Sequence, residues 1–134
     1  MIDIENDVYD LVESKATEHF GNLTMAGEYT RTPAKFPFAS LEMKSTVPLR
    51  KSRTTDSNEN HAIILFETNV CSNKKSGKKA ECKKILAFID TEMQRLGFTR
   101  IFTDSIPNRD DATIHRMVAR YQAVVSQDKV IYRR

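Results

Sequence analysis

Glu42 and Lys44 are separated by one residue in a segment, 35–45, that we expect to form a strand, so both side chains point to one face. Carboxylates suit Mg²⁺, and Glu28 on the neighbouring expected strand and Glu13 on the first helix could complete a cluster for metal-dependent nuclease chemistry. A Glu-x-Lys triplet is also common on solvated strand faces. Nuclease chemistry is therefore kept only as an alternative.

Other side chains that could bind a metal ion are few and badly spaced. They are His19, His61, His115, Cys71 and Cys82. His61 and Cys71 would lie about 33 Å apart along a straight strand, and the sequence contains neither a Cys-x-x-Cys nor a His-x-x-x-His pair. We expect no metal site, and two free thiols with Cys82 buried.

Covalent and nucleotide chemistry also lack the residues they need. His115 falls on the apolar face of an expected strand, where a histidine is usually a core or interface residue, and no triad can be assembled around it. The four glycines of the chain do not form a phosphate-binding loop. The sequence predicts no catalytic residue, no cofactor and a non-enzymatic role.

Two helices are expected to support the remaining elements. Apolar residues spaced three and four apart predict an amphipathic helix over 3–20, which Asp3 can cap. A second apolar stripe predicts a helix over 78–96, with Glu92 lying off the stripe and Gly97 ending the helix.

Strand patterns fill the rest of the chain, giving one domain over 1–134 with the order α-β-β-β-α-β-β-β. The expected strands are 23–30, 35–45, 61–71, 98–104, 112–126 and 130–133. The first half of 61–71 is apolar on both faces, which indicates a central strand. We therefore expect an α+β fold in which two helices pack on one face of a mostly antiparallel sheet.

Strand 112–126 has two different faces. One includes His115, Met117 and Tyr121 and suits the core, whereas the other alternates Arg116 and Arg120 with valines, as an interface would. The two arginines would lie about 13 Å apart on one face. They are candidates for pairing with carboxylates of a neighbouring subunit or for lining a pore through which DNA passes; the alternative is that they only keep a sheet edge soluble.

Charge is concentrated in two basic segments, although the net charge is only +3. Residues 46–60 lack an apolar pattern and contain Arg50, Lys51 and Arg53, so we expect a long mobile loop. It either becomes ordered on assembly and acts as a switch or is an inert surface loop. Lysines crowd 74–84, which indicates either a solvated surface or contact with an acidic partner or DNA. No apolar run is long enough to span a membrane, and the acidic N-terminus does not resemble a signal peptide.

The C-terminal half resembles the tail terminator (tail-to-head joining, tail completion) proteins of siphophages and prophages. The similarity covers about residues 80–134, and the rest of the chain is compatible in architecture. It is carried by Leu86-Ala87-Phe88-Ile89-Asp90, Met93, Leu96-Gly97-Phe98-Thr99-Arg100, Arg116-Met117-Val118-Ala119-Arg120-Tyr121 and Val130-Ile131-Tyr132-Arg133.

That resemblance implies a structural protein of the virion, assembled in the host cytoplasm. Its copies would form a hexameric ring that caps the tail tube, stops tube polymerisation and joins the tail to the head connector. The partners would be further copies of the chain, the tail-tube protein and the head-completion protein, with DNA passing through the ring without sequence-specific binding.

A ring requires two different patches on each subunit, and the sequence offers candidates for both. The arginine-bearing strand face is one, and the acidic first helix is the other. The candidate interface residues are Arg116, Arg120, Tyr121, Asp7, Asp10, Arg50, Lys51, Arg53 and Tyr132. The alternatives are a head-proximal adaptor, a DNA-binding domain, and a nuclease, whose restriction-type core has a similar element order but uses a metal-binding aspartate that is absent here.

Overall fold

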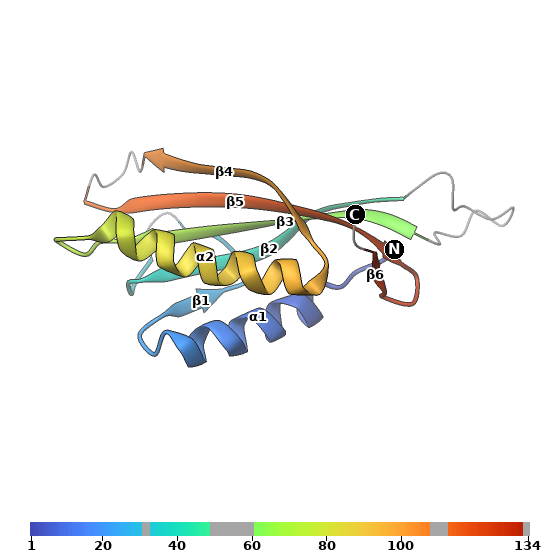
Figure 1. Cartoon of the computed structure of the whole chain (residues 1–134), viewed down its shortest axis with the longest axis horizontal. Helices are drawn as coiled ribbons and strands as arrows, with labels where there is room; N and C mark the ends of the chain where they lie inside the picture. The colour runs from blue at the N-terminus through green and yellow to red at the C-terminus, as the bar shows by residue number, and fades with distance from the viewer. Residues whose placement is uncertain (31–32, 49–60, 108–112, 133–134) are drawn as a thin grey trace, which may run out of the picture.

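The computed structural model describes residues 1–30, 33–48, 61–107 and 113–132, which form an α+β fold as the sequence predicts (Figure 1). Two helices and six strands follow one another in the expected order. They are α1 (Glu5–His19), β1 (Thr24–Ala26), β2 (Phe38–Pro48), β3 (His61–Ser72), α2 (Lys78–Leu96), β4 (Thr99–Pro107), β5 (His115–Ser126) and β6 (Ile131–Tyr132).

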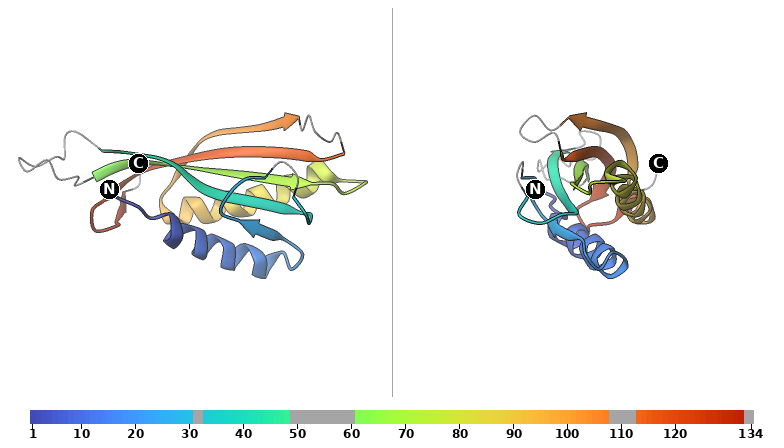
Figure 2. Two further views of the ribbon diagram at one scale, coloured as in Figure 1. Left: turned by 180° about the vertical axis from the view of Figure 1, so that it is seen from behind. Right: turned by 90° about the vertical axis from the view of Figure 1, so that its left-hand side faces the viewer.

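The strands form a single sheet of order β1-β2-β3-β5-β4, and β6 pairs with the end of β5. All the pairings are antiparallel except that of β1 with β2, which joins only three residues of each strand. Strand β3 is central, as expected from its apolar first half. Figure 2 shows both helices on one side of the sheet, so the other side has no helix against it.

Helix α1 buries Val8, Val12 and Ala16, the stripe that predicted it. It begins later than expected. The Asp3 carboxylate accepts a hydrogen bond from the Glu5 amide at 3.0 Å, but the backbone residue at the cap position is Ile4.

Helix α2 has the predicted bounds, and Gly97 ends it in the left-handed conformation at φ 105°. Its Glu92 is only 3% exposed, so its expected place off the buried stripe was wrong. The carboxylate bonds Arg95 at 2.9 Å and lies 3.3 Å from Nζ of Lys15 on α1. The two cations compensate the charge that burial would otherwise leave isolated.

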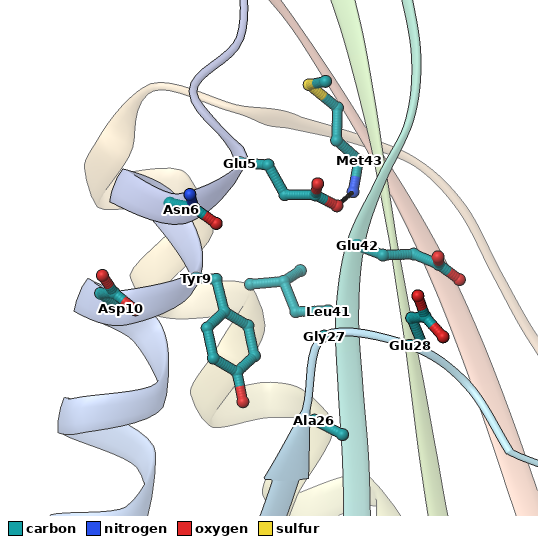
Figure 3. Close-up of a pocket in the computed structure, with 10 residues that line it drawn as sticks. All are labelled: Glu5, Asn6, Tyr9, Asp10, Ala26, Gly27, Glu28, Leu41, Glu42 and Met43. Atoms are coloured by element: carbon teal, nitrogen blue, oxygen red, sulfur yellow. Dashed lines mark hydrogen bonds between the residues drawn. The ribbon is translucent and has the colours of Figure 1, made fainter.

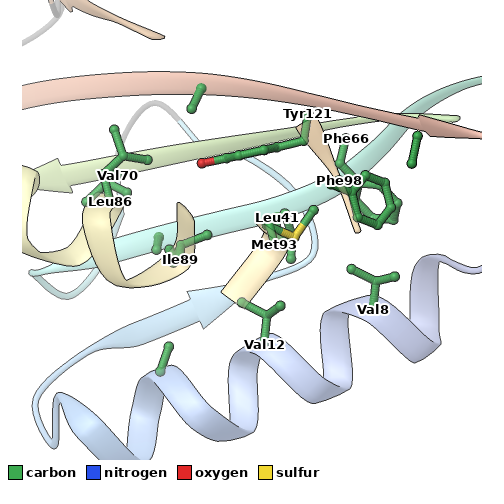
Figure 4. Close-up of a cluster of buried hydrophobic side chains, with 14 of the residues drawn as sticks. Val8, Val12, Leu41, Phe66, Val70, Leu86, Ile89, Met93, Phe98 and Tyr121 are labelled. Carbon is green, nitrogen blue, oxygen red and sulfur yellow. The ribbon is translucent and has the colours of Figure 1, made fainter. Parts of the chain in front are cut away.

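The core lies between the helices and the sheet (Figure 4). Phe66 and Tyr121 are fully buried there, together with Met93 of α2. The rings of His19 and Phe88 stack at 4.6 Å, and Lys15 approaches Glu92, so α1 and α2 run antiparallel. Their N-terminal ends therefore lie at opposite ends of the helix layer.

Several boundaries differ from the sequence-based expectation. Residues 46–48, assigned to a loop, continue β2 to Pro48, because they pair with Ala62–Ile64 of β3. The expected strand 23–30 is reduced to Thr24–Ala26, whereas β4 extends to Pro107. Within the described residues, no helix is both long and apolar enough to cross a bilayer.

Candidate assembly surfaces

Four polar side chains form a continuous hydrogen-bonded row across the helix-free face of the sheet. Arg116 Nε donates to Asn69 Oδ1 at 2.9 Å, Asn69 Nδ2 donates to Glu67 Oε1 at 3.1 Å, and Arg120 Nε donates to Glu67 Oε2 at 2.9 Å. We call this row, Arg116-Asn69-Glu67-Arg120, the polar ladder. It places the two arginines predicted from sequence on one face, as expected.

The ladder follows from strand register. Glu67 on β3 lies directly opposite Arg120 on β5. Asn69 lies opposite Val118, which is two residues after Arg116 and on the same face. Asn69 is fully buried and Glu67 is 7% exposed, whereas half of the Arg120 side chain remains exposed. The buried members thus hold both arginines through the Nε of each guanidinium group, while half of the Arg120 side chain stays exposed.

Aromatic rings flank both ends of the ladder. The Arg116 guanidinium lies 4.2 Å from the centre of the Tyr29 ring, and that of Arg120 lies 5.9 Å from the Phe102 ring. Beside Tyr29, a small apolar cluster built on Phe38 covers this end of the face. The sequence analysis did not identify Glu67 and Asn69 as partners of the two arginines. Their alternation along β3, which puts both on one face, was the signal that could have indicated them.

Tyr121 requires a correction, because it does not lie on an accessible surface. It is fully buried on the helix-facing side of β5, and its hydroxyl donates a 2.9 Å hydrogen bond to Asp90 Oδ1 of α2. Burial, followed by the nearby Asp90 carboxylate, raises the pKa of the Tyr121 hydroxyl well above its ordinary value. In this structure Tyr121 joins helix to sheet and is not available to a neighbouring subunit.

Asp7 and Asp10 both lie on the exposed side of α1, as the interface prediction requires. Asp7 forms a 3.2 Å ion pair with Lys129 in which both side chains remain more than half exposed. Asp10 lines an open groove of about 700 Å³ between α1 and the β1–β2 region (Figure 3). Within the groove, Glu5 Oε2 accepts a 2.8 Å hydrogen bond from the Met43 amide.

The carboxylates proposed for a nuclease site do not converge on one point. Glu28 and Glu42 both line the groove, but Glu13 is not among its lining residues, and Glu42 pairs with Lys44 at 3.1 Å. Among the described residues, no three histidine, cysteine or acidic side chains are grouped so that they could hold a metal ion.

The lysine-rich start of α2 lies beside the start of β5. Lys78 Nζ donates to the Thr113 carbonyl at 3.3 Å. Burial, with further effects from Lys79, Lys78 and Lys83, lowers the pKa of His115 below its ordinary 6.5. This end of the molecule therefore favours a neutral imidazole and carries a concentration of positive charge.

Both cysteines are free, and both are buried, although burial was expected only for Cys82. Burial raises the pKa of Cys71 to about 11 against the opposing effect of Arg116, and it raises the pKa of Cys82 to about 12. The Cys82 thiol contacts the His115 carbonyl at 3.3 Å. Neither thiol is therefore activated as a nucleophile at neutral pH.

The remaining predicted interface residues lie wholly or partly outside the part of the chain that the structure describes. Tyr132 pairs through its backbone with Val124, and its side chain is outside the described part of the chain. Arg50, Lys51 and Arg53, with the rest of 49–60, also lie outside the described residues.

No protein-family model matches the chain, and no curated protein is significantly similar to it.

Proposed function

We propose that this chain is a structural tail terminator of a siphophage or prophage, acting as a ring of identical subunits. The ring, a hexamer by the resemblance, caps the last ring of tail-tube protein, stops its polymerisation and presents a surface to the head connector. In this role the chain catalyses no reaction. Its site of action is the head-tail junction of the virion.

The polar ladder is the observation that carries this proposal. Arginines are enriched in protein interfaces, and a side chain whose stem is already fixed loses less conformational entropy on binding. Glu67 holds Arg120 through its Nε at 2.9 Å, and half of the Arg120 side chain remains exposed, so this arginine meets both conditions. A ladder of this kind suits contact with carboxylates of another subunit or with the phosphates of DNA inside a ring.

Charge at the two helix starts also suits a subunit that contacts a different partner at each of its two ends. The start of α1 is acidic and that of α2 is basic, and the antiparallel helices place them at opposite ends of their layer. The residues are Asp3, Glu5, Asp7 and Asp10 at α1 and Lys74, Lys75, Lys78, Lys79 and Lys83 at α2. Oppositely charged ends of this kind suit a subunit that lies between the tail tube on one side and the head connector on the other.

Charge reversal in the ladder tests the proposal. We expect Arg120→Glu to prevent ring formation and to yield tails of uncontrolled length, both scored by negative-stain electron microscopy. The matched control is Lys35→Glu, which also replaces a positive charge by a negative one, at an exposed residue that is not a member of the ladder. Unfolding curves establish that both variants fold. Normal rings and normal tails with folded Arg120→Glu would contradict the proposal.

A further inference from the structure

Both edges of the sheet offer backbone for further pairing. Strand β4 is the last strand of the order β1-β2-β3-β5-β4, so nothing described pairs with its outer edge. At the other edge, β1 covers β2 only from Phe38 to Ser40. Beyond Ser40, the Met43 amide donates to Glu5 Oε2 at 2.8 Å and the Thr46 hydroxyl donates to the Ile2 carbonyl at 3.3 Å, but no described strand pairs with the outer edge of the segment from Lys44 to Pro48.

These edges carry exposed apolar side chains. Ile101 and Phe102 on β4 are 53% and 43% exposed, and Val47 on β2 is 54% exposed. Strand β4 contains no lysine, and its proline stands at its last residue, so it lacks two common means of preventing edge-to-edge association. A long edge strand of this composition is suited to pairing with another chain.

Strand direction favours pairing of one edge with the other. The strands β2, β3, β5 and β4 are joined by three successive antiparallel pairings, so β2 and β4 run in opposite directions. When a second copy is placed beside the first in the same orientation, its β2 is antiparallel to the first copy's β4. The same contact can then be repeated from copy to copy until a ring closes.

We propose that β4 of one copy pairs with the Lys44–Pro48 segment of β2 in the next copy, extending the sheet from subunit to subunit. This inference rests on the proposed ring and identifies its interface. Its register places Phe102 opposite Val47. It then places Asp104 opposite Ser45, next to Lys44.

That register matches both face and charge. Phe102 and Asp104 lie opposite Arg120 and Val118 of β5, which puts them on the helix-free face. Val47 and Ser45 lie opposite Ile63 and Leu65 of β3, on the same face. Residues paired directly across antiparallel strands must share a face, so two exposed apolar side chains meet.

The adjacent charges are also opposite in sign. Lys44 bonds Glu42 at 3.1 Å, which holds its ammonium on the helix-free face where Asp104 of the other copy would lie. Contact between Asp104 and Lys44 then disfavours registers that bring Asp104 beside Glu42. The pairing is thus specified by one apolar and one charged contact.

Disulfide trapping tests this register in the full-length chain. Val47→Cys and Phe102→Cys are combined in one variant, and each is also made singly; the native Cys71 and Cys82 are buried and do not compete. After mild oxidation, we expect the double variant to give a series of cross-linked species, of which the largest contains as many copies as the ring. An equimolar mixture of the two single variants should give only dimers, because each copy then has one new thiol.

Other outcomes overturn the inference. Dimers from Phe102→Cys alone would show that β4 pairs with itself. If electron microscopy shows rings but the double variant does not cross-link, the edge pairing is wrong while the ring proposal survives. If the double variant cross-links but its copies form open filaments and never a ring, the edge pairing would be supported and the proposed function contradicted.

A substitution without cysteine chemistry gives an independent check. Phe102→Lys places a charge on the edge strand and is expected to abolish assembly by light scattering and electron microscopy. The control is Ala87→Lys, which places the same charge on an exposed residue in the middle of α2, outside both edge strands and both helix starts. Rings that persist with Phe102→Lys would overturn the pairing.

Discussion

Arg120 and Glu67 face each other across strands β5 and β3, with Nε and Oε2 2.9 Å apart. The second oxygen of Glu67 accepts from Asn69, which in turn accepts from Arg116. A single carboxylate thus orients both arginines of the helix-free face. The exposed half of Arg120 is positioned by a residue that is itself buried.

Removal of this carboxylate should weaken both folding and assembly. Glu67→Ala leaves the buried Asn69 amide without its acceptor, so we expect a loss of about 2 kcal/mol in the free energy of unfolding, measured with urea. Because Arg120 is half exposed, its coupling to Glu67 in a double-mutant cycle with Arg120→Ala should be only about 0.5–1 kcal/mol. If Glu67→Ala left the free energy of unfolding unchanged, the polar ladder would not be formed in solution.

Tyr121→Phe separates the core from the assembly surface. The lost hydroxyl donates to Asp90, which also bonds Arg100 at 3.2 Å and Gln94 at 2.7 Å. We expect a cost of about 1–2 kcal/mol in unfolding free energy and no change in oligomeric state. If Tyr121→Phe disrupted assembly while leaving stability unchanged, Tyr121 would have to contact a partner.

Thiol labelling reports the burial of the cysteines. With pKa values of about 11 and about 12, Cys71 and Cys82 are almost entirely protonated at pH 8. We expect maleimide or disulfide reagents to react with both only after unfolding. Rapid labelling of either thiol in the native protein would contradict the packing of β3 against α2.

The lowered pKa of His115 predicts a pH dependence. Its neutral form is favoured in the folded state, so its contribution to stability is complete above pH 6.5 and is lost as pH falls through the folded pKa. Titration of the imidazole by NMR should give a value below 6.5, and Lys79→Gln should raise it. The same pKa in native and unfolded protein would exclude this effect.

Much of the fold follows from local patterns. Stripes such as Val8-Val12-Ala16 and the glycine at the end of α2 were sufficient to locate both helices. The boundaries of β1 and β2 were less predictable, because they depend on which segments of the sheet find partners. Thr46–Pro48 has no strand pattern of its own and is extended because it pairs with β3.

The prediction of the site failed where the partners of a side chain are determined by the register between strands that are distant in sequence. The alternation of β5 placed Arg116 and Arg120 on one face, but nothing local shows that Glu67 and Asn69, some fifty residues earlier, bond them. Glu92 was placed off the buried stripe of its helix; in the structure it is buried, with its charge compensated by Lys15 of the other helix and by Arg95. Both cases concern polar groups whose compensation comes from distant parts of the chain.

Imaging of the purified chain with and without tail-tube protein tests the central claim most directly. Negative-stain and cryo-electron microscopy should show closed rings of a single size seated at one end of each tube, and phages lacking the chain should have tails of irregular length that fail to join heads. If the chain never closes into a ring in either condition and such phages carry normal, head-attached tails, the account is contradicted.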